Sequence, residues 1–356
     1  MSETLKVAIV GLGRMGTVHA LHLYELARET GACEFAALAD IDIERARRFS
    51  NDIDRQVPVF ASLEELVKAA VCQATVIVTP TENHREHAAT LIAAGHRVLL
   101  EKPLTGSLNS DREFAEELDR NHPNALMLAF QRRFDDPLIY ARQLAQSGVI
   151  GRVFKVYSAL EDSNPAPNGY RSGGILPDMS VHNVDEILWL TGRAPSHAVT
   201  IGSRIYSHRL TTCVEDFDDA LLYIWFESDL VAQIQVSRNH VSGYRVETVL
   251  FGEEGQIHVG RFEQRPFDVE VEAYGRRGRS EPLARRTFRM RDYGRHLPEF
   301  VDRFGPAYKA ELKAFIDCCR TGTSFPTTHR EGLCAQEVIS AGMRSIIGPQ
   351  QAARVE

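Results

Sequence analysis

Along the first third of the chain, short apolar runs alternate with stretches that have a helical pattern. The apolar runs predict buried parallel strands, which are nearly continuous in Val, Ile, Leu and Ala. They are Lys6–Val10, Glu34–Ala39, Ala74–Val78, Arg97–Leu100 and Ala125–Ala129. The helical stretches are Gly16–Ala27, Ile43–Phe49, Leu63–Ala69, Arg85–Ala94 and Ser110–Asn121. This alternation predicts an α/β fold whose first domain is a Rossmann-type doubly wound parallel sheet.

Beyond about residue 150 the pattern changes to strands with period-2 alternation, broken by Gly- and Asp-rich turns. The predicted strands are Val153–Leu160, Ala198–Ile205, Ala220–Phe226, Leu230–Ser237, Val246–Gly252, Gln256–Val259 and Val269–Tyr274. The predicted helices are Pro137–Gln146, Asp178–Leu190, Pro298–Cys319 and Leu333–Ile347. We therefore expect a C-terminal α+β domain built on a large, mostly antiparallel open sheet. A length of 356 residues also favours two domains.

Composition narrows the class of protein. The net charge of −7 argues against non-specific nucleic-acid binding. No apolar run reaches the roughly 18 residues of a membrane span, and no charged-then-apolar leader precedes the first strand. The six cysteines show no C-x-x-C spacing, so we expect reduced thiols, no metal site and a cytoplasmic protein.

The first strand runs directly into the glycine motif Gly11-Leu12-Gly13-Arg14-Met15-Gly16. In this context Gly11 permits a tight turn, Gly13 lets the backbone approach a pyrophosphate, and Gly16 lets the helix pack closely on the strand. The helix N-terminus, which includes Arg14 and Met15, offers N–H groups to phosphates. The motif predicts dinucleotide binding, and the alternative is a glycine-rich turn in some other kind of α/β unit.

Asp40 ends the second strand, near the roughly 20-residue spacing expected for the carboxylate that binds the adenosine ribose. A carboxylate there repels a 2′-phosphate, so we expect NAD rather than NADP, with Ile41 beside it. Arg45 and Arg47 follow closely and leave NADP tolerance open. The alternative is that Asp40 caps the next helix, a task for which Asp42 competes.

Two loops follow strands at the carboxyl edge of the predicted sheet. Thr79-Pro80 leads to Asn83 and His84, which either contact the cofactor or form an ordinary strand-to-helix turn. Glu101-Lys102 follows the next strand. Lys102 either hydrogen-bonds a substrate hydroxyl that loses its proton or is a surface lysine paired with Glu101.

In the second domain, Asp178 and His182 lie four residues apart on a predicted helix and so face one side. A histidine oriented by an acid is a standard general-base arrangement. The alternative is that Asp178 complements the helix dipole while His182 pairs with Asp185.

The segments Ala8–Gly16, Thr79-Pro80, Glu101–Leu104 and Asp178–Asp185, taken in order, resemble the Gfo/Idh/MocA oxidoreductase family over nearly the whole chain. The phrase from Asp178 to His182 resembles the inositol dehydrogenases of that family. The resemblance implies an NAD-binding domain over residues 1–125 and a substrate-binding and oligomerisation domain over residues 126–356. The final helix is expected to be able to pack back on the first domain.

The resemblance also implies site residues and an activity. Lys102, Asp178 and His182 would be the catalytic set, and Arg132 would lie close to both cofactor and substrate. Asp162, Tyr244 and Tyr308 are candidates for further substrate contacts. For these three residues and for Arg132, the alternative is a surface or packing role. Glu101 is expected to contribute to cofactor binding. The implied activity is NAD-dependent oxidation of a secondary hydroxyl of a cyclitol or pyranose sugar, in a dimer or tetramer formed through the C-terminal sheet.

Asn183 and the Glu331-Gly332 pair depart from the family's usual Asp residues, which leaves the substrate more open than the reaction type. Two alternatives remain on the same scaffold. One is a catalytically silent regulator that senses NAD or a sugar, against which the joint presence of Lys102, Asp178 and His182 speaks. The other is a glycosidase that oxidises its substrate transiently with NAD.

Overall fold

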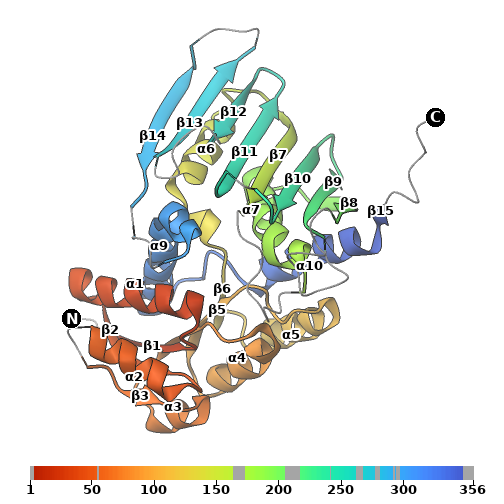
Figure 1. Cartoon of the computed structure of the whole chain (residues 1–356). Coiled ribbons are helices and arrows are strands. Elements are labelled where there is room, and N and C mark those ends of the chain that lie inside the picture. The colour runs from red at the N-terminus through yellow and green to blue at the C-terminus, as the bar shows by residue number, and fades with distance from the viewer. Residues whose placement is uncertain are drawn as a thin grey trace. The chain divides into compact units, whose positions relative to one another are not determined.

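The chain folds into two units in the computed structural model, which describes residues 4–53, 56–162, 173–204, 217–240, 242–261, 268–276, 281–291, 293 and 297–347 (Figure 1). Unit 1 comprises Met1–Gln131 and Ala307–Leu333, and unit 2 comprises Arg132–Pro306 and Cys334–Glu356. Helices α9 (Glu299–Thr321) and α10 (His329–Arg344) each have residues in both units. The division thus differs from a single cut after residue 125.

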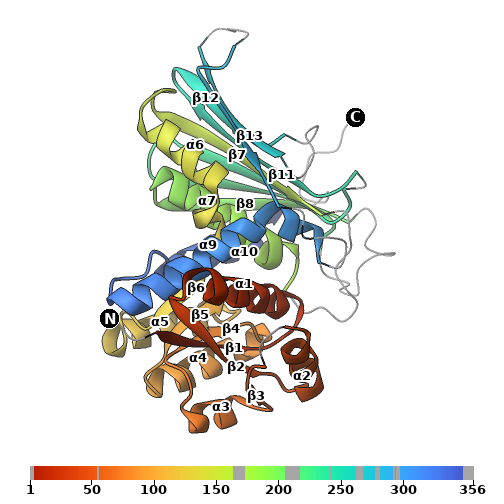
Figure 2. The same cartoon turned by 90° about the vertical axis from the view of Figure 1, so that its left-hand side faces the viewer.

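Unit 1 is built on six parallel strands in the order β3-β2-β1-β4-β5-β6. The strands are β1 (Leu5–Val10), β2 (Cys33–Ala39), β3 (Val59–Phe60), β4 (Ala74–Ile77), β5 (Arg97–Glu101) and β6 (Leu126–Ala129). The helices are α1 (Arg14–Thr30), α2 (Ile43–Asp52), α3 (Leu63–Ala69), α4 (His84–Ala93) and α5 (Leu108–Asn121). Helix α1 lies on one face of the sheet, and α3 and α4 lie on the other (Figure 2). The predicted doubly wound parallel sheet is confirmed.

Residues 307–333 belong to unit 1 because specific contacts hold them there. Lys309 Nζ lies 2.9 Å from Glu25 Oε2 of α1, and the ring of Phe315 stacks on that of Phe325 at 5.6 Å. The hydroxyl of Thr327 donates to the Leu128 carbonyl of β6 at 2.6 Å. The C-terminal part of α9 therefore lies beside α1 and completes the core of the first unit.

Unit 2 is built on a nine-stranded sheet in the order β14-β13-β12-β11-β7-β10-β9-β8-β15. Among the described strands of this sheet, only β7–β10 and β8–β15 pair in parallel, so the predicted large, mostly antiparallel sheet is confirmed. The strands are β7 (Val153–Glu161), β8 (Pro195–Ser203), β9 (Asp219–Phe226), β10 (Val231–Ser237), β11 (Arg245–Gly252), β12 (Gly255–Val259), β13 (Asp268–Gly275), β14 (Ala284–Arg289) and β15 (Ile346–Ile347).

Several predicted bounds need correction. The predicted last helix ends at Arg344 rather than Ile347, because Ile346–Ile347 instead form β15 beside β8. The predicted helix Asp178–Leu190 begins with a π-helical turn, η3 (Leu176–Ser180), followed by α7 (Val181–Thr191). The predicted end of the strand at Ile205 lies outside the described residues.

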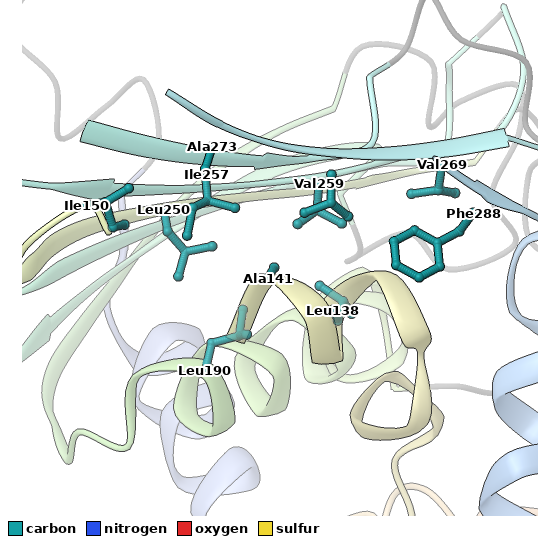
Figure 3. Close-up of a cluster of buried hydrophobic side chains, with 11 residues drawn as sticks. Leu138, Ala141, Ile150, Leu190, Leu250, Ile257, Val259, Val269, Ala273 and Phe288 are labelled. Carbon is teal, nitrogen blue, oxygen red and sulfur yellow. The ribbon is translucent and has the colours of Figure 1, made fainter. Parts of the chain in front are cut away.

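The core of unit 2 lies between the sheet and helix α6 (Asp136–Gln146). Figure 3 shows Leu138 and Ala141 of α6 pointing toward Ile257 and Val259 of β12, with Phe288 of β14 at one end. Alternate residues of each strand point to this face, as a pleated sheet requires.

The structure also bears on the cysteines and on possible membrane-spanning helices. The described cysteines, Cys33, Cys72, Cys318, Cys319 and Cys334, form no disulfide, and Cys213 lies outside the described residues. Within the described part of the chain, no helix is both long enough and apolar enough to cross a bilayer.

Leu138→Ala should destabilise the protein by about 2–5 kcal/mol, because it removes a side chain that is 1% exposed and leaves a cavity under β12. The free energy of unfolding is measured by urea titration followed by circular dichroism. The matched control is Leu283→Ala, whose side chain is 48% exposed and should cost no more than about 0.5 kcal/mol. Equal losses in the two variants would contradict this description of the core.

Candidate functional site: a dinucleotide cleft and two polar clusters

A cleft of about 600 Å³ opens in unit 1 at the carboxyl ends of β1, β2 and β4. The strand order reverses direction between β1 and β4, which is where parallel α/β sheets bind ligands. Of the residues predicted to bind the dinucleotide, those that line this cleft are Gly11, Gly13, Asp40, Ile41, Thr79, Pro80 and Asn83. Arg45, Ser62 and His87 also line it and were not predicted to bind.

The glycine loop fits its predicted roles. Gly11 has φ +91°, and a Cβ there would lie 2.6 Å from the Val78 carbonyl oxygen. A Cβ at Gly16 would overlap the carbonyl of Gly11, which is the close packing of α1 on the turn after β1. A Cβ at Gly13 would meet no described protein atom within 4 Å, although Gly13 lines the cleft. The space beside Gly13 is therefore available to a ligand.

The N-terminus of α1 suits an anion. Its N-cap residue is Gly13, which has no side chain that could accept from the first N–H groups. The first turn contains Arg14, Met15 and Gly16 and has no acidic residue. The backbone N–H groups of that turn are the ones that phosphate oxygens accept from in dinucleotide folds. These observations fit a bound dinucleotide.

Asp40 holds the glycine loop in place. Its Oδ2 accepts from the Leu12 backbone N–H at 2.6 Å, and its Oδ1 accepts from the Asp42 N–H at 2.8 Å. Helix α2 is capped by Asp42, whose carboxylate accepts from the Arg45 N–H, so Asp40 is not the cap. The Arg45 guanidinium lies 3.7 Å from the Asp40 carboxylate. Asp40 is thus a buried carboxylate that follows β2 and lines the cleft.

The loop that carries Lys102 follows β5 at the same edge of the sheet. The buried imidazole of His19 on α1 lies 2.8 Å from Glu101 Oε1, and Glu101 Oε2 accepts from the Lys102 backbone N–H at 3.1 Å. Burial alone raises the pKa of Glu101, but the hydrogen bond with His19 and the charges of His19 and Lys102 outweigh it, so the net pKa is lowered. Glu101 thus stays ionised and keeps the backbone at Lys102 in place.

Two further contacts tie the same loop. His84 is buried, with Nδ1 2.7 Å from the Pro103 carbonyl oxygen and Nε2 2.9 Å from that of Thr79. Burial lowers the pKa of His84, against the opposing effect of the two carbonyl groups. The carboxylate of Asp111 accepts from the Thr105 N–H at 2.8 Å. A neutral imidazole donates from one nitrogen only, so the tautomer decides whether His84 donates to Pro103 of the Lys102 loop or to Thr79 after β4. His84 therefore packs between these two loops and does not line the cleft.

In unit 2, the predicted acid–base residues lie at the junction of η3 and α7. Asp178 Oδ2 pairs with Arg238 Nη2 at 3.2 Å, and both side chains are largely buried. The π-helical turn reduces the rotation per residue, so Asp178 and His182 remain on one side of the helix. No sequence pattern indicated Arg238, because a single arginine after a strand is normally a surface residue.

The predicted substrate residues Asp162 and Tyr244 lie near this cluster, since β7, β10 and β11 are neighbours. Asp162 follows β7, and its N–H donates to the Ser237 carbonyl at 2.8 Å. Tyr244 precedes β11 and is partly buried. Burial raises the pKa of Tyr244, and the charges of Arg132 and Asp162 also act on it.

Arg132 is buried inside unit 2. Its Nη1 donates to Glu186 Oε2 at 2.6 Å, and its guanidinium lies 5.3 Å from the centroid of the Phe304 ring. Its Nε and Nη2 groups have no hydrogen-bond partner among the described residues. Two N–H groups of Arg132 can therefore donate to another group, while Nη1 is paired with Glu186. The sequence analysis did not identify Glu186.

Tyr308 belongs to unit 1, where it is 5% exposed and its ring meets that of His19 edge-on at 5.7 Å. The two departures from the family pattern also have structural partners. The Asn183 amide donates to Ser158 Oγ at 2.7 Å, and Glu331 accepts from both the N–H and the hydroxyl of Thr328 at the start of α10. Glu331 therefore acts as a capping residue.

The fold and the cleft define a two-unit protein whose first unit is of the dinucleotide-binding class, and comparison with known proteins identifies an oxidoreductase family. Residues 5–130 match the oxidoreductase family with an NAD-binding Rossmann fold, and residues 138–258 match the GFO/IDH/MocA C-terminal domain. The chain belongs to the Gfo/Idh/MocA family of oxidoreductases.

Its similarities extend over the full length. Inositol 2-dehydrogenase 1 of Paenarthrobacter aurescens is 26% identical over 97% of this chain and 94% of its own. The scyllo-inositol 2-dehydrogenase (NAD(+)) of Bacillus subtilis is 27% identical over 90% of this chain and 88% of its own. The crystal structure of apo scyllo-inositol dehydrogenase from Lactobacillus casei has a TM-score of 0.80 at 25% identity, over 97% of this chain and 96% of that one.

Gly13→Ala should leave the thermal unfolding midpoint unchanged and weaken NADH binding at least about tenfold, because the added methyl enters only the ligand's space. Binding is measured by NADH fluorescence titration and unfolding by scanning calorimetry. Gly16→Ala is the contrasting variant, in which overlap with the Gly11 carbonyl lowers the unfolding midpoint itself. Undiminished NADH affinity in Gly13→Ala would place the dinucleotide elsewhere.

Proposed function

We propose that the protein is an NAD-dependent dehydrogenase that oxidises a secondary hydroxyl of a cyclitol, such as myo- or scyllo-inositol, or of a pyranose sugar. The observation that carries the proposal is the braced Lys102 loop, which follows β5 at the sheet edge that holds the dinucleotide cleft. The full-length similarity to inositol dehydrogenases supports the substrate class.

The cofactor would be held by residues of unit 1. The glycine loop and the first turn of α1, with Arg14 and Met15, would bind the pyrophosphate, while Asp40 and Ile41 would face the adenosine ribose. Thr79, Pro80 and Asn83, which line the same cleft, would also contact the cofactor. When bound, nicotinamide supplies the hydride acceptor. The contacts of Glu101 and His84 favour supporting roles over direct contact with the cofactor.

In this proposal Lys102 joins Asp178 and His182 around the substrate. His182 accepts the proton of the reacting hydroxyl, and Asp178 orients and stabilises its imidazole. The Lys102 ammonium binds the same oxygen and stabilises its developing negative charge. The other hydroxyl groups would bind Asp162, Tyr244 and the remaining donors of Arg132, whereas the burial of Tyr308 against His19 favours a packing role.

A screen of inositol isomers and common aldoses should reveal NADH formation with NAD and much less NADPH formation with NADP, followed by absorbance. His182→Ala should lower the turnover of the best substrate by roughly 10²–10⁴ because it removes the general base. His122→Ala, on the exposed end of α5, is the matched control and should keep full activity.

Other outcomes would favour the alternatives. Tight binding of a sugar or NAD with no NADH from any polyol would indicate a sensing regulator. Cleavage of an aryl glycoside without accumulation of NADH would indicate a glycosidase. Full turnover in His182→Ala would exclude this residue as the base.

We also propose that the chain forms a dimer or tetramer through its nine-stranded sheet. Leu250 of the core is in register with Val156, Ala232 and Ile224, so these residues share the face that α6 covers. Because strand residues alternate, Leu221 and Trp225 point to the opposite face, beside Ile201 of β8. We call the face that carries Ile201, Leu221 and Trp225 the open face.

These three side chains of the open face are 51%, 46% and 42% exposed, respectively, and clustered exposed apolar groups on a sheet suit an interface. A second copy of the chain is the occupant that the family resemblance implies. The described cysteines form no disulfide, which supports the proposed cytoplasmic location.

The double variant Leu221→Glu/Trp225→Glu should dissociate the oligomer, because carboxylates cannot be buried unpaired between two sheets. Size-exclusion chromatography with light scattering gives the mass. Leu283→Glu changes a leucine of similar exposure in the β13–β14 connection and should leave the mass unchanged. A wild-type monomer, or an oligomer that survives both substitutions on the open face, would refute this interface.

A further inference from the structure

We infer that His19 and Glu101 are a positioning pair that connects the dinucleotide-binding helix α1 to Lys102 and keeps the Lys102 ammonium charged. This inference rests on the proposed function for its catalytic meaning, because it concerns how the chain prepares Lys102. The pair itself is a feature of unit 1 alone.

The contact joins elements far apart in sequence. His19 lies in the second turn of α1, whose N-terminus is at the glycine loop, and Glu101 is the last residue of β5. Their side chains meet at 2.8 Å across 82 residues of sequence. His19 is fully buried, and its Nδ1 has no hydrogen-bond partner among the described residues. The hydrogen bond through Nε2 is therefore directed at Glu101 alone.

The second carboxylate oxygen of Glu101 connects the His19–Glu101 pair to the Lys102 loop. Oε2 accepts from the backbone N–H of Lys102, so the orientation of the carboxylate fixes where the lysine leaves the sheet. A buried carboxylate that loses its partner is strongly penalised. His19 thus supplies what Glu101 needs to remain ionised beside Lys102.

The charge effect is reciprocal. The Lys102 ammonium favours the ionised form of Glu101, so the Glu101 carboxylate must favour the charged form of Lys102 equally. An ammonium is the form that can donate to a substrate oxygen and stabilise its negative charge. The pair therefore extends toward alkaline pH the range in which Lys102 is active.

Other titratable groups face the pair from the elements around it. His84 of α4 acts on Glu101, and His22, one turn along α1, acts on His19. Tyr308 of α9 packs edge-on against the His19 ring, and the buried Glu311 lies one turn further along α9. None of these is changed in the variants below, so their contributions cancel in the comparison.

The test measures Lys102 directly, in the protein without cofactor or substrate. The rate of Lys102 acetylation by acetic anhydride is followed across pH by peptide mass spectrometry, since only the neutral amine reacts. In Glu101→Gln the midpoint should fall by about one pH unit, because the neighbouring negative charge is lost while the side-chain shape is kept. In the active enzyme, the alkaline limb of kcat/KM should move the same way.

His19 is tested by two variants. His19→Leu removes the hydrogen bond that orients the Glu101 carboxylate, so kcat/KM for the best polyol should fall at least about tenfold. The Lys102 midpoint should stay near its wild-type value, because Glu101 is still ionised at the alkaline pH where a lysine titrates. His19→Gln keeps an amide donor and should restore most of the wild-type kcat/KM. Glu113→Gln, a change in an exposed carboxylate paired with Arg85, is the matched control and should have no effect.

A purely structural pair would lower the unfolding temperature of Glu101→Gln but leave its Lys102 midpoint at the wild-type value, and that result would overturn the inference. Equal kcat/KM values in His19→Leu and His19→Gln would also overturn it. If the midpoint shifts as expected but no polyol is oxidised, the pair stands and the proposed function fails. If Glu101→Gln does not fold, the comparison of the two His19 variants still tests the inference.

Discussion

The structure of unit 1 depends on the close approach of helix α1 to the end of β1. This approach is possible only because Gly16 has no side chain where it meets the Gly11 carbonyl. The Asp40 carboxylate then fixes the turn by accepting the Leu12 N–H. The same approach directs the N-terminus of α1 at the cleft and places His19 against Glu101. One packing constraint thus sets both the anion site and the support of Lys102.

Unit 2 is organised by ion pairs between arginines and carboxylates that are mostly buried. Asp135 receives two hydrogen bonds from Arg303, at 2.6 and 2.8 Å, and Asp185 receives a bidentate contact from Arg133. Such pairs contribute little net stability, but each strongly disfavours arrangements that leave one partner alone. The Arg133–Asp185 pair holds the segment after Gln131 against α7, the helix that carries His182. The Arg303–Asp135 pair holds the same segment against the first part of α9.

Much of this could be predicted from sequence, because it depends on local patterns. The parallel strands of unit 1 are continuous apolar runs, and the glycine motif follows the first of them. Strand β14 escaped prediction because Arg285 and Arg286 break the apolar pattern. Its pairing is supported by the Arg285–Glu272 ion pair, which only the folded sheet brings together. Likewise β3 has two residues, too few for a pattern.

The unpredicted site residues share one property, which is that their partners are distant in sequence. Arg238 is paired with Asp178, and His19 with Glu101. The i, i+4 spacing placed Asp178 near His182 but could not reveal an arginine 60 residues away. The inclusion of residues 307–333 in unit 1 depends in the same way on contacts such as Lys309 with Glu25.

In the proposed function, hydride passes directly from a polyol carbon to the nicotinamide of a dinucleotide whose pyrophosphate lies at the glycine loop. The most direct measurement uses the best polyol substrate, deuterated at the carbon that is oxidised, with mass spectrometry of the reduced cofactor. Direct hydride transfer predicts that each reduced nicotinamide carries one deuterium. Reduced cofactor without the label, with deuterium released to water, would contradict it.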